Sequence, residues 1–203
     1  MKKTIAALSL LFAAQGAFAA DDVFTLKGEL KDFGDTVVAM IPNGFEFQRD
    51  TILVKNGKFT TTIKVDEPKD IYLVSMSTLH RKDNKQLKIV AVPGETAELK
   101  GDAVTDYQIS GTKFYQQLGQ LNRQLASTQK ELDTFTESLS KRLKAGEERS
   151  KVMDEYEAKA PVYEKKINDA IFDFITKHAS WEASAVAAGA LGKDQIEEGI
   201  SYL

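Results

Sequence analysis

Apolar and polar residues alternate along much of residues 23–110. Phe24, Leu26 and Leu30 are separated by polar side chains, which is the pattern of a strand with one buried face. Residues 37–41 form a continuous apolar run that stops at a Pro-Asn-Gly turn. The pattern predicts short strands at residues 24–30, 37–41, 51–55, 58–65, 71–78, 87–92, 96–100 and 107–110. Strands this short and this closely spaced predict an antiparallel β-sandwich or a partly open barrel.

The clearest local signal is the Asn56-Gly57 pair, which lies between two strand-like segments. Asn and Gly both tolerate the positive φ angles of a type I′ turn. We therefore expect residues 51–55 and 58–65 to form a two-residue β-hairpin.

After Gly111 the apolar residues recur at every third or fourth position. This spacing predicts a long amphipathic helix that reaches Leu143, with a stop at Gly146 and a later boundary or kink at Pro161. The helical segments expected after the long helix are 147–159, 162–178, 181–191 and 193–203. The fold class is therefore expected to be α+β, a β-sandwich or partly open barrel followed by a helical hairpin or linker.

The long helices have two arrangements open to them. A parallel coiled-coil homodimer needs an unbroken apolar seam, and the seam is interrupted at Gln129. An antiparallel pair within one chain fits the pattern better. A homodimer through the helices remains the alternative.

Residues 1–19 have the three parts of a secretory signal peptide. Lys2 and Lys3 precede an apolar run that ends at the small residues Ala17 and Ala19. The run is shorter than the roughly 20 residues that span a bilayer, so we expect cleavage and a mature protein in the periplasm, of the Gram-negative type, that does not span the membrane. The expected division is a signal peptide at 1–19, a β-sandwich domain at 20–111 and a helical linker region at 112–203.

Charge and composition exclude several classes of function. Loss of Lys2 and Lys3 with the signal takes the formal net charge from −3 to −5. Basic and acidic residues are interspersed, so the clustered basic surface that nucleic acid requires is not expected. The chain has no cysteine and only two histidines, His80 and His178, which excludes thiolate chemistry and argues against a metal site. We expect no cofactor and no enzyme activity in this chain.

One catalytic spacing does occur. Ser138 and Lys141 match the S-x-x-K pattern, in which a lysine one helical turn away activates a nucleophilic serine. No S-D-N or K-T-G motif accompanies them, so we interpret both residues as helix surface. For the histidines we expect a solvated loop around His80 and a helix end at His178, where a cationic side chain suits the helix dipole.

Phe45 and Phe47 are the candidate residues for contact with a partner. They follow the Pro-Asn-Gly turn and are separated by a single glutamate, so in an extended chain both rings lie on the same side. A loop with exposed aromatic rings is typical of a contact surface.

Several short motifs follow one another along the chain. They are Phe24-x-Leu26-x-Gly28-x-Leu30, Asp50-Thr51, Val54-Lys55-Asn56-Gly57-Lys58-Phe59, Pro68 with Tyr72-Leu73, Val92-Pro93-Gly94-Glu95, Ile109-Ser110-Gly111-Thr112, Phe174-Ile175-x-Lys177-His178 and Ser184. In this order they resemble a domain of unknown function at the N-terminus of periplasmic thioredoxin-like thiol-disulfide oxidoreductases of the TlpA/ResA kind.

The resemblance implies that a thioredoxin-fold domain with a C-x-x-C pair follows the helical linker. This chain has no cysteine and ends at Leu203 without a helix stop. We therefore expect either that such a domain follows in a longer protein or that the module exists alone. In both cases the redox activity of the family is assigned to no residue present here.

These observations lead to two hypotheses. The first is a non-catalytic N-terminal module of a periplasmic thiol-disulfide oxidoreductase, which positions, dimerises or docks a downstream thioredoxin-like domain or a protein client. The alternative is a stand-alone secreted module that binds a peptide or a glycan through a sandwich edge or the loop of Phe45 and Phe47.

Overall fold

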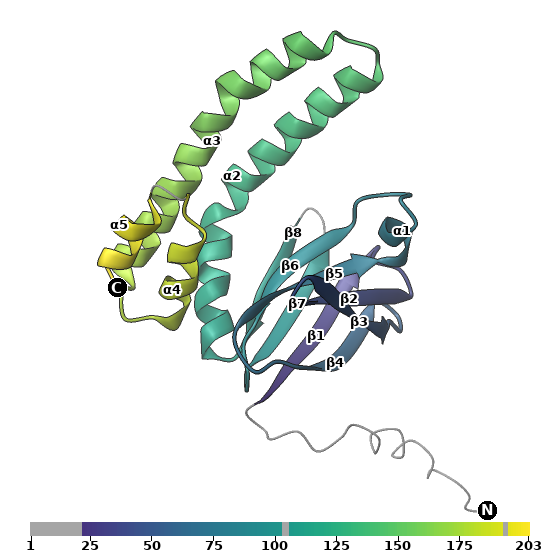
Figure 1. Ribbon diagram of the computed structural model, residues 1–203, viewed down its shortest axis with the longest axis vertical. Coiled ribbons are helices and arrows are strands. Elements are labelled where there is room, and N and C mark those ends of the chain that lie inside the picture. The colour runs from purple at the N-terminus through teal and green to yellow at the C-terminus, as the bar shows by residue number, and fades with distance from the viewer. Residues whose placement is uncertain (1–21, 103–105, 193–194) are drawn as a thin grey trace, which may run out of the picture.

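The computed structural model describes residues 22–102, 106–192 and 195–203, and within them two β-sheets are followed by helices (Figure 1). The strands are β1 (Val23–Lys31), β2 (Thr36–Asn43), β3 (Glu46–Leu53), β4 (Lys58–Lys64), β5 (Lys69–Ser75), β6 (Gln86–Ala91), β7 (Thr96–Asp102) and β8 (Asp106–Gly111). The helices are α1 (Met76–Leu79), α2 (Lys113–Lys144), α3 (Arg149–Lys177), α4 (Glu182–Gly189) and α5 (Ile196–Ser201). The expected signal peptide lies outside the described residues.

The two sheets have four strands each and form an open sandwich. The first sheet has the strand order β4-β1-β7-β8, and the second has the order β3-β2-β5-β6. Neighbouring strands are antiparallel except for β1 and β7, which run parallel. The expected α+β class, with a sandwich followed by helices, is confirmed.

The inner faces of the sheets meet in a core of alternate strand residues. Phe24 and Leu26 of β1 and Ile71 and Leu73 of β5 all belong to this core, and all four are buried. The same core continues into the bases of the helices, because Tyr115, Phe174, Ala187 and their neighbours belong to the same cluster of buried residues. Sandwich and helix bases are therefore packed as one unit.

Helices α2 and α3 form an antiparallel pair that projects from the sandwich as an arm (Figure 1). The preferred arrangement within one chain is confirmed. Phe135, Leu139 and Val152 form a second, smaller cluster within the arm. The predicted stop is confirmed too, since Gly146 has φ +87° and the amides of Gly146 and Glu147 donate to the last carbonyls of α2.

Of the two alternatives predicted at Pro161, a boundary or a kink, the boundary is wrong. One helix, α3, runs through this position instead of ending near residue 159. Pro161 faces solvent. Because it lacks an amide hydrogen, the carbonyl one turn earlier loses its partner in the helix, and on an exposed face water can take that place.

The hairpin predicted around Asn56-Gly57 is also wrong, although the turn itself is confirmed. Asn56 and Gly57 have φ of +53° and +74°, as a type I′ turn requires. The pairing stops after a single bridge between Lys55 and Lys58, because β3 pairs with β2 in the second sheet and β4 pairs with β1 in the first. Backbone bonds hold the two diverging strands, since Val54 donates to Asp35 and Leu30 donates to Gly57.

Two strand boundaries differ from the prediction by more than two residues. The strand expected at 71–78 ends at Ser75, whose side chain accepts a hydrogen bond from the Thr78 amide and begins α1. The strand expected at 51–55 begins earlier, at Glu46. Phe47 therefore lies in a strand and not in a loop.

Candidate functional site

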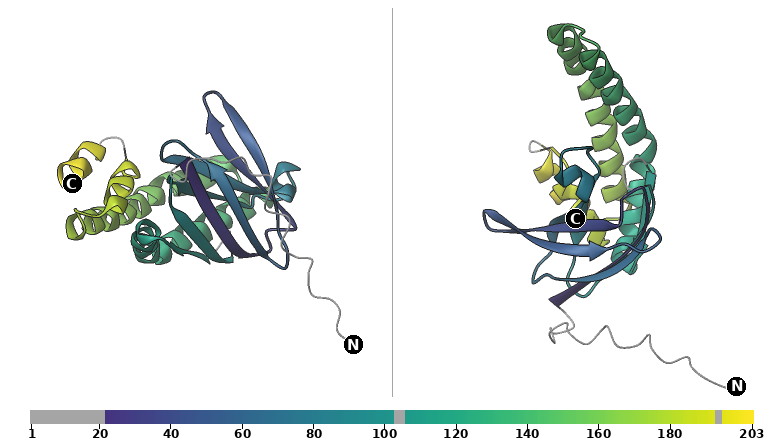
Figure 2. Two further views of the ribbon diagram at one scale, coloured as in Figure 1. Left: turned by 90° about the horizontal axis from the view of Figure 1, so that it is seen from below. Right: turned by 90° about the vertical axis from the view of Figure 1, so that its right-hand side faces the viewer.

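Phe45 and Phe47 lie on the β2–β3 hairpin, which extends past the edge of the sandwich (Figure 2). Phe45 is in the turn between the two strands and is fully exposed. Phe47 is the second residue of β3 and is 46% exposed. The two rings were expected on the same side of an extended segment, but the structure places Phe45 in the turn at the tip of the hairpin and Phe47 on the outer face of the second sheet.

Phe47 belongs to an apolar outer face of the second sheet. Phe47 is opposite Pro42 of β2, and Met40, which is also in β2, is opposite Tyr72 of β5. The rings of Phe47 and Tyr72 meet edge to face with their centroids 6.2 Å apart. We call the outward apolar residues of this sheet the Phe47 face; they are Met40, Pro42, Phe47, Leu53, Tyr72 and Val90, none of them fully buried.

The opposite side of the hairpin is polar. Glu46, Gln48 and Asp50 alternate with Phe47, Arg49 and Thr51 along β3, and the Gln48 amide donates to the Asp50 carboxylate at 3.2 Å. Further along the strand, Ile52 returns to the core and is buried. Near the hairpin tip β3 therefore carries carboxylate and amide side chains on one side, and Phe47, Arg49 and Thr51 on the other.

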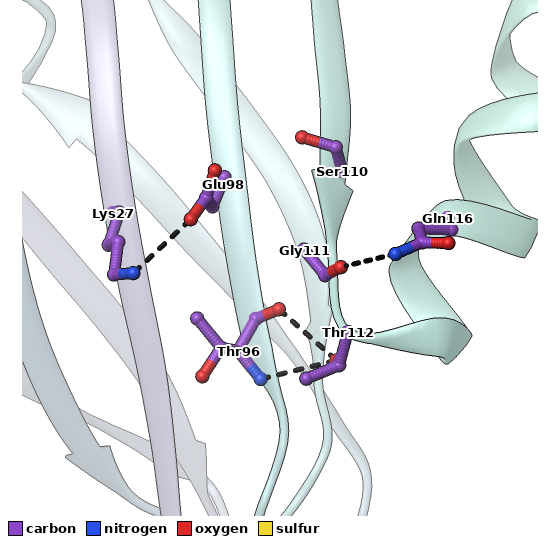
Figure 3. Close-up of a pocket in the computed structure, with 7 residues that line it drawn as sticks. All are labelled: Lys27, Thr96, Glu98, Ser110, Gly111, Thr112 and Gln116. Carbon is purple, nitrogen blue, oxygen red and sulfur yellow. Dashed lines mark hydrogen bonds and ion pairs between the residues drawn. The ribbon is translucent and has the colours of Figure 1, made fainter.

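The outer face of the first sheet contrasts with the Phe47 face because it is polar. An open hollow of about 500 Å³ lies there, where β8 turns into α2 (Figure 3). Lys27 pairs with Glu98 at 3.2 Å, Gln116 donates to the Gly111 carbonyl at 3.0 Å, and Thr112 donates to the Thr96 carbonyl at 3.2 Å (Figure 3). The Lys27–Glu98 pair joins β1 to β7, and the other two bonds join the start of α2 to the sheet, so we assign the hollow a structural role.

The S-x-x-K pair lies on the arm, and its side chains are engaged separately. The Ser138 hydroxyl donates to the Phe135 carbonyl at 2.7 Å, and Lys141 is 3.8 Å from Glu137. Ser138 does line a shallow hollow of about 580 Å³ together with Phe135 and Tyr163. A lysine that activates a serine must bond to its hydroxyl, and neither side chain makes that contact here.

The two histidines have structural positions. His80 is the C-cap of α1, and its backbone amide donates to Met76. His178 is the C-cap of α3 and stacks on Trp181 with the ring centroids 3.9 Å apart. The predicted helix-end position of His178 is confirmed, and His80 closes a short helix within the exposed connection that was expected.

The part of the chain that the structure describes has no group of three or more metal-ligating side chains, and the sequence has no cysteine. These findings are compatible with a non-enzymatic chain. None of the helices described is both long and apolar enough to cross a membrane.

Sequence reasoning found Phe45 and Phe47 but missed most of the Phe47 face. Met40, Leu53 and Val90 were assigned to ordinary strands. The signal that could have found Met40 is the unbroken apolar run 37–41. Successive strand residues point to opposite faces, so such a run places apolar side chains on both sides of a sheet.

Comparison with known proteins gives one match. Residues 24–118 match the family model of a domain of unknown function, DUF4369. No curated protein and no solved structure matches this chain. The matched span begins in β1 and ends in the second turn of α2, so the sandwich and the Phe47 face are the part of the chain that is similar to DUF4369.

Proposed function

We propose that this chain is a non-catalytic docking module of a periplasmic protein and that it holds a protein partner through Phe45 and the Phe47 face. The partner we propose is a thioredoxin-like domain, on the same or on another chain. The observation that carries the proposal is the projecting β2–β3 hairpin, with a fully exposed phenylalanine at its tip.

The distribution of apolar surface supports docking on the second sheet. Phe45, Phe47 and Leu53 are all exposed, and they lie on one hairpin. Burial of a phenylalanine side chain by a partner contributes roughly 2–3 kcal/mol, and buried aromatic anchors dominate the energetics of many interfaces. The polar outer face of the first sheet offers no such anchor.

The charges near the hairpin indicate what kind of partner fits. Glu46 and Asp50 lie on the hairpin, and Asp66 and Glu67 lie in the β4–β5 connection at the same end of the second sheet. Arg49 and Lys69 lie at this end too, and Lys69 pairs with Asp66 at 2.8 Å, so the end keeps a smaller net negative charge, which disfavours an anionic membrane surface. We therefore propose a protein pocket that is apolar at its centre and basic at its rim.

A site-specific photo-crosslinker at position 45 tests the proposal in cells that secrete the full chain. The matched control carries the crosslinker at Thr60, which is exposed on the polar outer face of the first sheet. We expect position 45, and not position 60, to give an adduct that contains a thioredoxin-like domain. A Phe47→Ser change, which leaves the crosslinker in place, should weaken that adduct.

Other outcomes overturn the proposal in distinct ways. Equal adducts from both positions, or none from position 45, contradict docking through the hairpin. Specific adducts from position 45 with a protein that has no thioredoxin-like domain, or with a glycan, contradict the oxidoreductase context and favour the stand-alone binding module.

A further inference from the structure

We propose that the partner joins the second sheet as an additional strand, antiparallel to β3, with an acidic residue opposite Arg49 and basic residues opposite Asp50 and Glu46. This inference rests on the proposed docking function and names the form and the charge pattern of the docked segment. Its basis is the free edge of β3 and the order of side chains along it.

Strand β3 is an edge strand. Among the strands that the structure describes it pairs only with β2, in a continuous register from Glu46 to Leu53, without a bulge, a proline or a glycine. Most of its residues are exposed, which shows that neither face of its outer half is covered. A regular, exposed edge presents unpaired backbone donors and acceptors in the spacing that another strand needs.

The side chains of β3 define what an added strand must carry. On the Phe47 face, Phe47 and Leu53 favour apolar residues opposite them, and Arg49, which lies between them, favours an acidic residue. On the other face, Glu46 and Asp50 call for basic residues. Within the described part of the chain Arg49 has no ion pair, so its charge is available to a partner.

A second copy of this chain is a poor occupant of the same edge. Two β3 strands that pair antiparallel around a two-fold axis must keep outward residues opposite outward residues. In the registers that pair nearly the whole strand, Arg49 then faces the second Arg49, or Asp50 faces the second Asp50. Like charges directly opposite one another are destabilising, so this edge favours a different, complementary strand.

Two synthetic peptides of equal composition test this inference on the full chain. The matched peptide carries, in antiparallel register, lysine opposite Glu46 and Asp50, glutamate opposite Arg49 and apolar residues opposite Phe47 and Leu53. The control peptide exchanges the residues opposite Arg49 and Asp50. Because two cross-strand charge pairs change from attractive to repulsive, we expect the matched peptide to bind about tenfold more tightly in fluorescence anisotropy.

A charge-exchanged protein provides the reciprocal test. The double variant Arg49→Asp, Asp50→Arg changes surface residues of β3 and should fold like the parent, as checked by circular dichroism. It should prefer the control peptide over the matched one. In addition, N-methylation of the peptide amides that face β3 should abolish binding, whereas N-methylation of the outward amides should not.

Each possible result either supports strand addition at β3 or overturns it. Equal binding of the two peptides, no binding of either, or equal tolerance of both methylation patterns overturns strand addition. If the full chain self-associates and the single change Arg49→Asp weakens or strengthens that association, a second copy is the occupant of this edge. That result would also overturn the proposal. If the crosslinking at position 45 succeeds while the peptides fail, the docking function stands and only its strand-addition form is wrong.

Discussion

At the scale of single atoms, Gly28 explains why the motif around it in β1 occurs together with the motif that ends at Phe59 in β4. It lies opposite Phe59 in the pairing of β1 with β4, and a β-carbon at Gly28 would collide with the Phe59 ring. The ring lies over the glycine, and both residues are buried. We therefore expect Gly28→Ala to lower the free energy of unfolding by about 1–3 kcal/mol, as overpacking does in other cores, measured by urea denaturation.

The matched control for this prediction is Gly189→Ala. Gly189 is the last residue of α4, its φ is not positive, and a β-carbon there meets no atom within 4 Å. Alanine is the better helix former, so this change should leave stability unaltered or raise it by a few tenths of a kcal/mol. An equal loss of stability in both variants would contradict the packing argument.

At the scale of elements, the sequence predicts where most strands and helices lie but not which strands pair. Alternating residues identify β1, and the three-to-four spacing identifies α2, because each pattern follows directly from the geometry of one element. The turn at Asn56-Gly57 has the same local conformation whether its strands stay paired or diverge. Whether the two strands stay paired or diverge depends on Val54, Leu30 and Ile52. Their contacts are made with residues outside the two strands' own pairing, so the local sequence carries no signal of them.

The same limit applies to the candidate site. Phe47 stands out in the sequence because it is an aromatic residue beside a turn. The neighbours that make it part of a face, Met40 and Tyr72, come from β2 and β5 and meet it only through the sheet register. A surface built from three strands therefore becomes visible only when the pairing is known.

Substitution of two glycines that have left-handed backbones tests how far the effect of a strained turn spreads through the structure. Gly57 and Gly146 have φ of +74° and +87°, and an alanine costs about 1 kcal/mol in such a conformation. Gly57 lies against the Leu30 carbonyl in the sandwich, whereas Gly146 lies at the tip of the arm with no atom near its missing side chain. Hydrogen exchange should show Gly57→Ala loosening β4 and β1, and Gly146→Ala loosening only the arm tip; the reverse pattern would contradict the topology.

The tip of the arm is also where an acid-dependent change is expected. Arg142 donates to Glu147 and to Glu155 at 2.5–2.7 Å and so joins the end of α2 to the start of α3. Hydrogen bonds from Lys159 and Arg142 lower the pKa of Glu155 from 4.5 to about 2, and Arg142 lowers the pKa of Glu147. A lowered carboxyl pKa stabilises the folded form above the ordinary pKa, and that contribution is lost as the pH falls through the folded value.

We therefore expect amides at the arm tip to exchange faster, after correction for intrinsic rates, as the pH falls from about 4.5 towards 2. The amides of the sandwich should change less over that range. In Arg142→Gln this link between α2 and α3 is already broken at neutral pH, so the acid-dependent step should be smaller. An acid-dependent step of full size in Arg142→Gln would show that other groups cause it.

At the scale of the whole molecule, the chain combines two outer faces of opposite character with one shared core. The first sheet is polar on its outside and is joined to α2, while the outside of the second sheet carries the Phe47 face beside polar residues such as the Lys88–Asp70 ion pair and ends in the projecting hairpin. The expected boundary near residue 111 separates strands from helices in sequence. In space the core crosses it, because Tyr115 of α2 and Phe174 of α3 pack in the same cluster as Phe24.

Tyr115 is the residue through which this continuity can be tested. It is fully buried, its ring is 5.8 Å from Phe24 of β1, and its hydroxyl donates to the Val90 carbonyl of β6 at 2.7 Å. It thus ties α2 to a strand of each sheet. Tyr115→Ala should lower the free energy of unfolding by about 3–5 kcal/mol through the cavity it leaves, and Tyr115→Phe by about 1 kcal/mol through the lost hydrogen bond.

Trp181, the single tryptophan of the chain, reports on the helix bases because it packs on His178 and Phe174. Far-ultraviolet circular dichroism reports on the strands as well as the helices. If sandwich and helix bases unfold as one unit, urea transitions followed by the two signals coincide in the parent protein and shift together in Tyr115→Ala. A tryptophan transition that stays in place while the dichroism transition moves to lower urea would show that the helix bases unfold separately, and the shared core would then not be a cooperative unit.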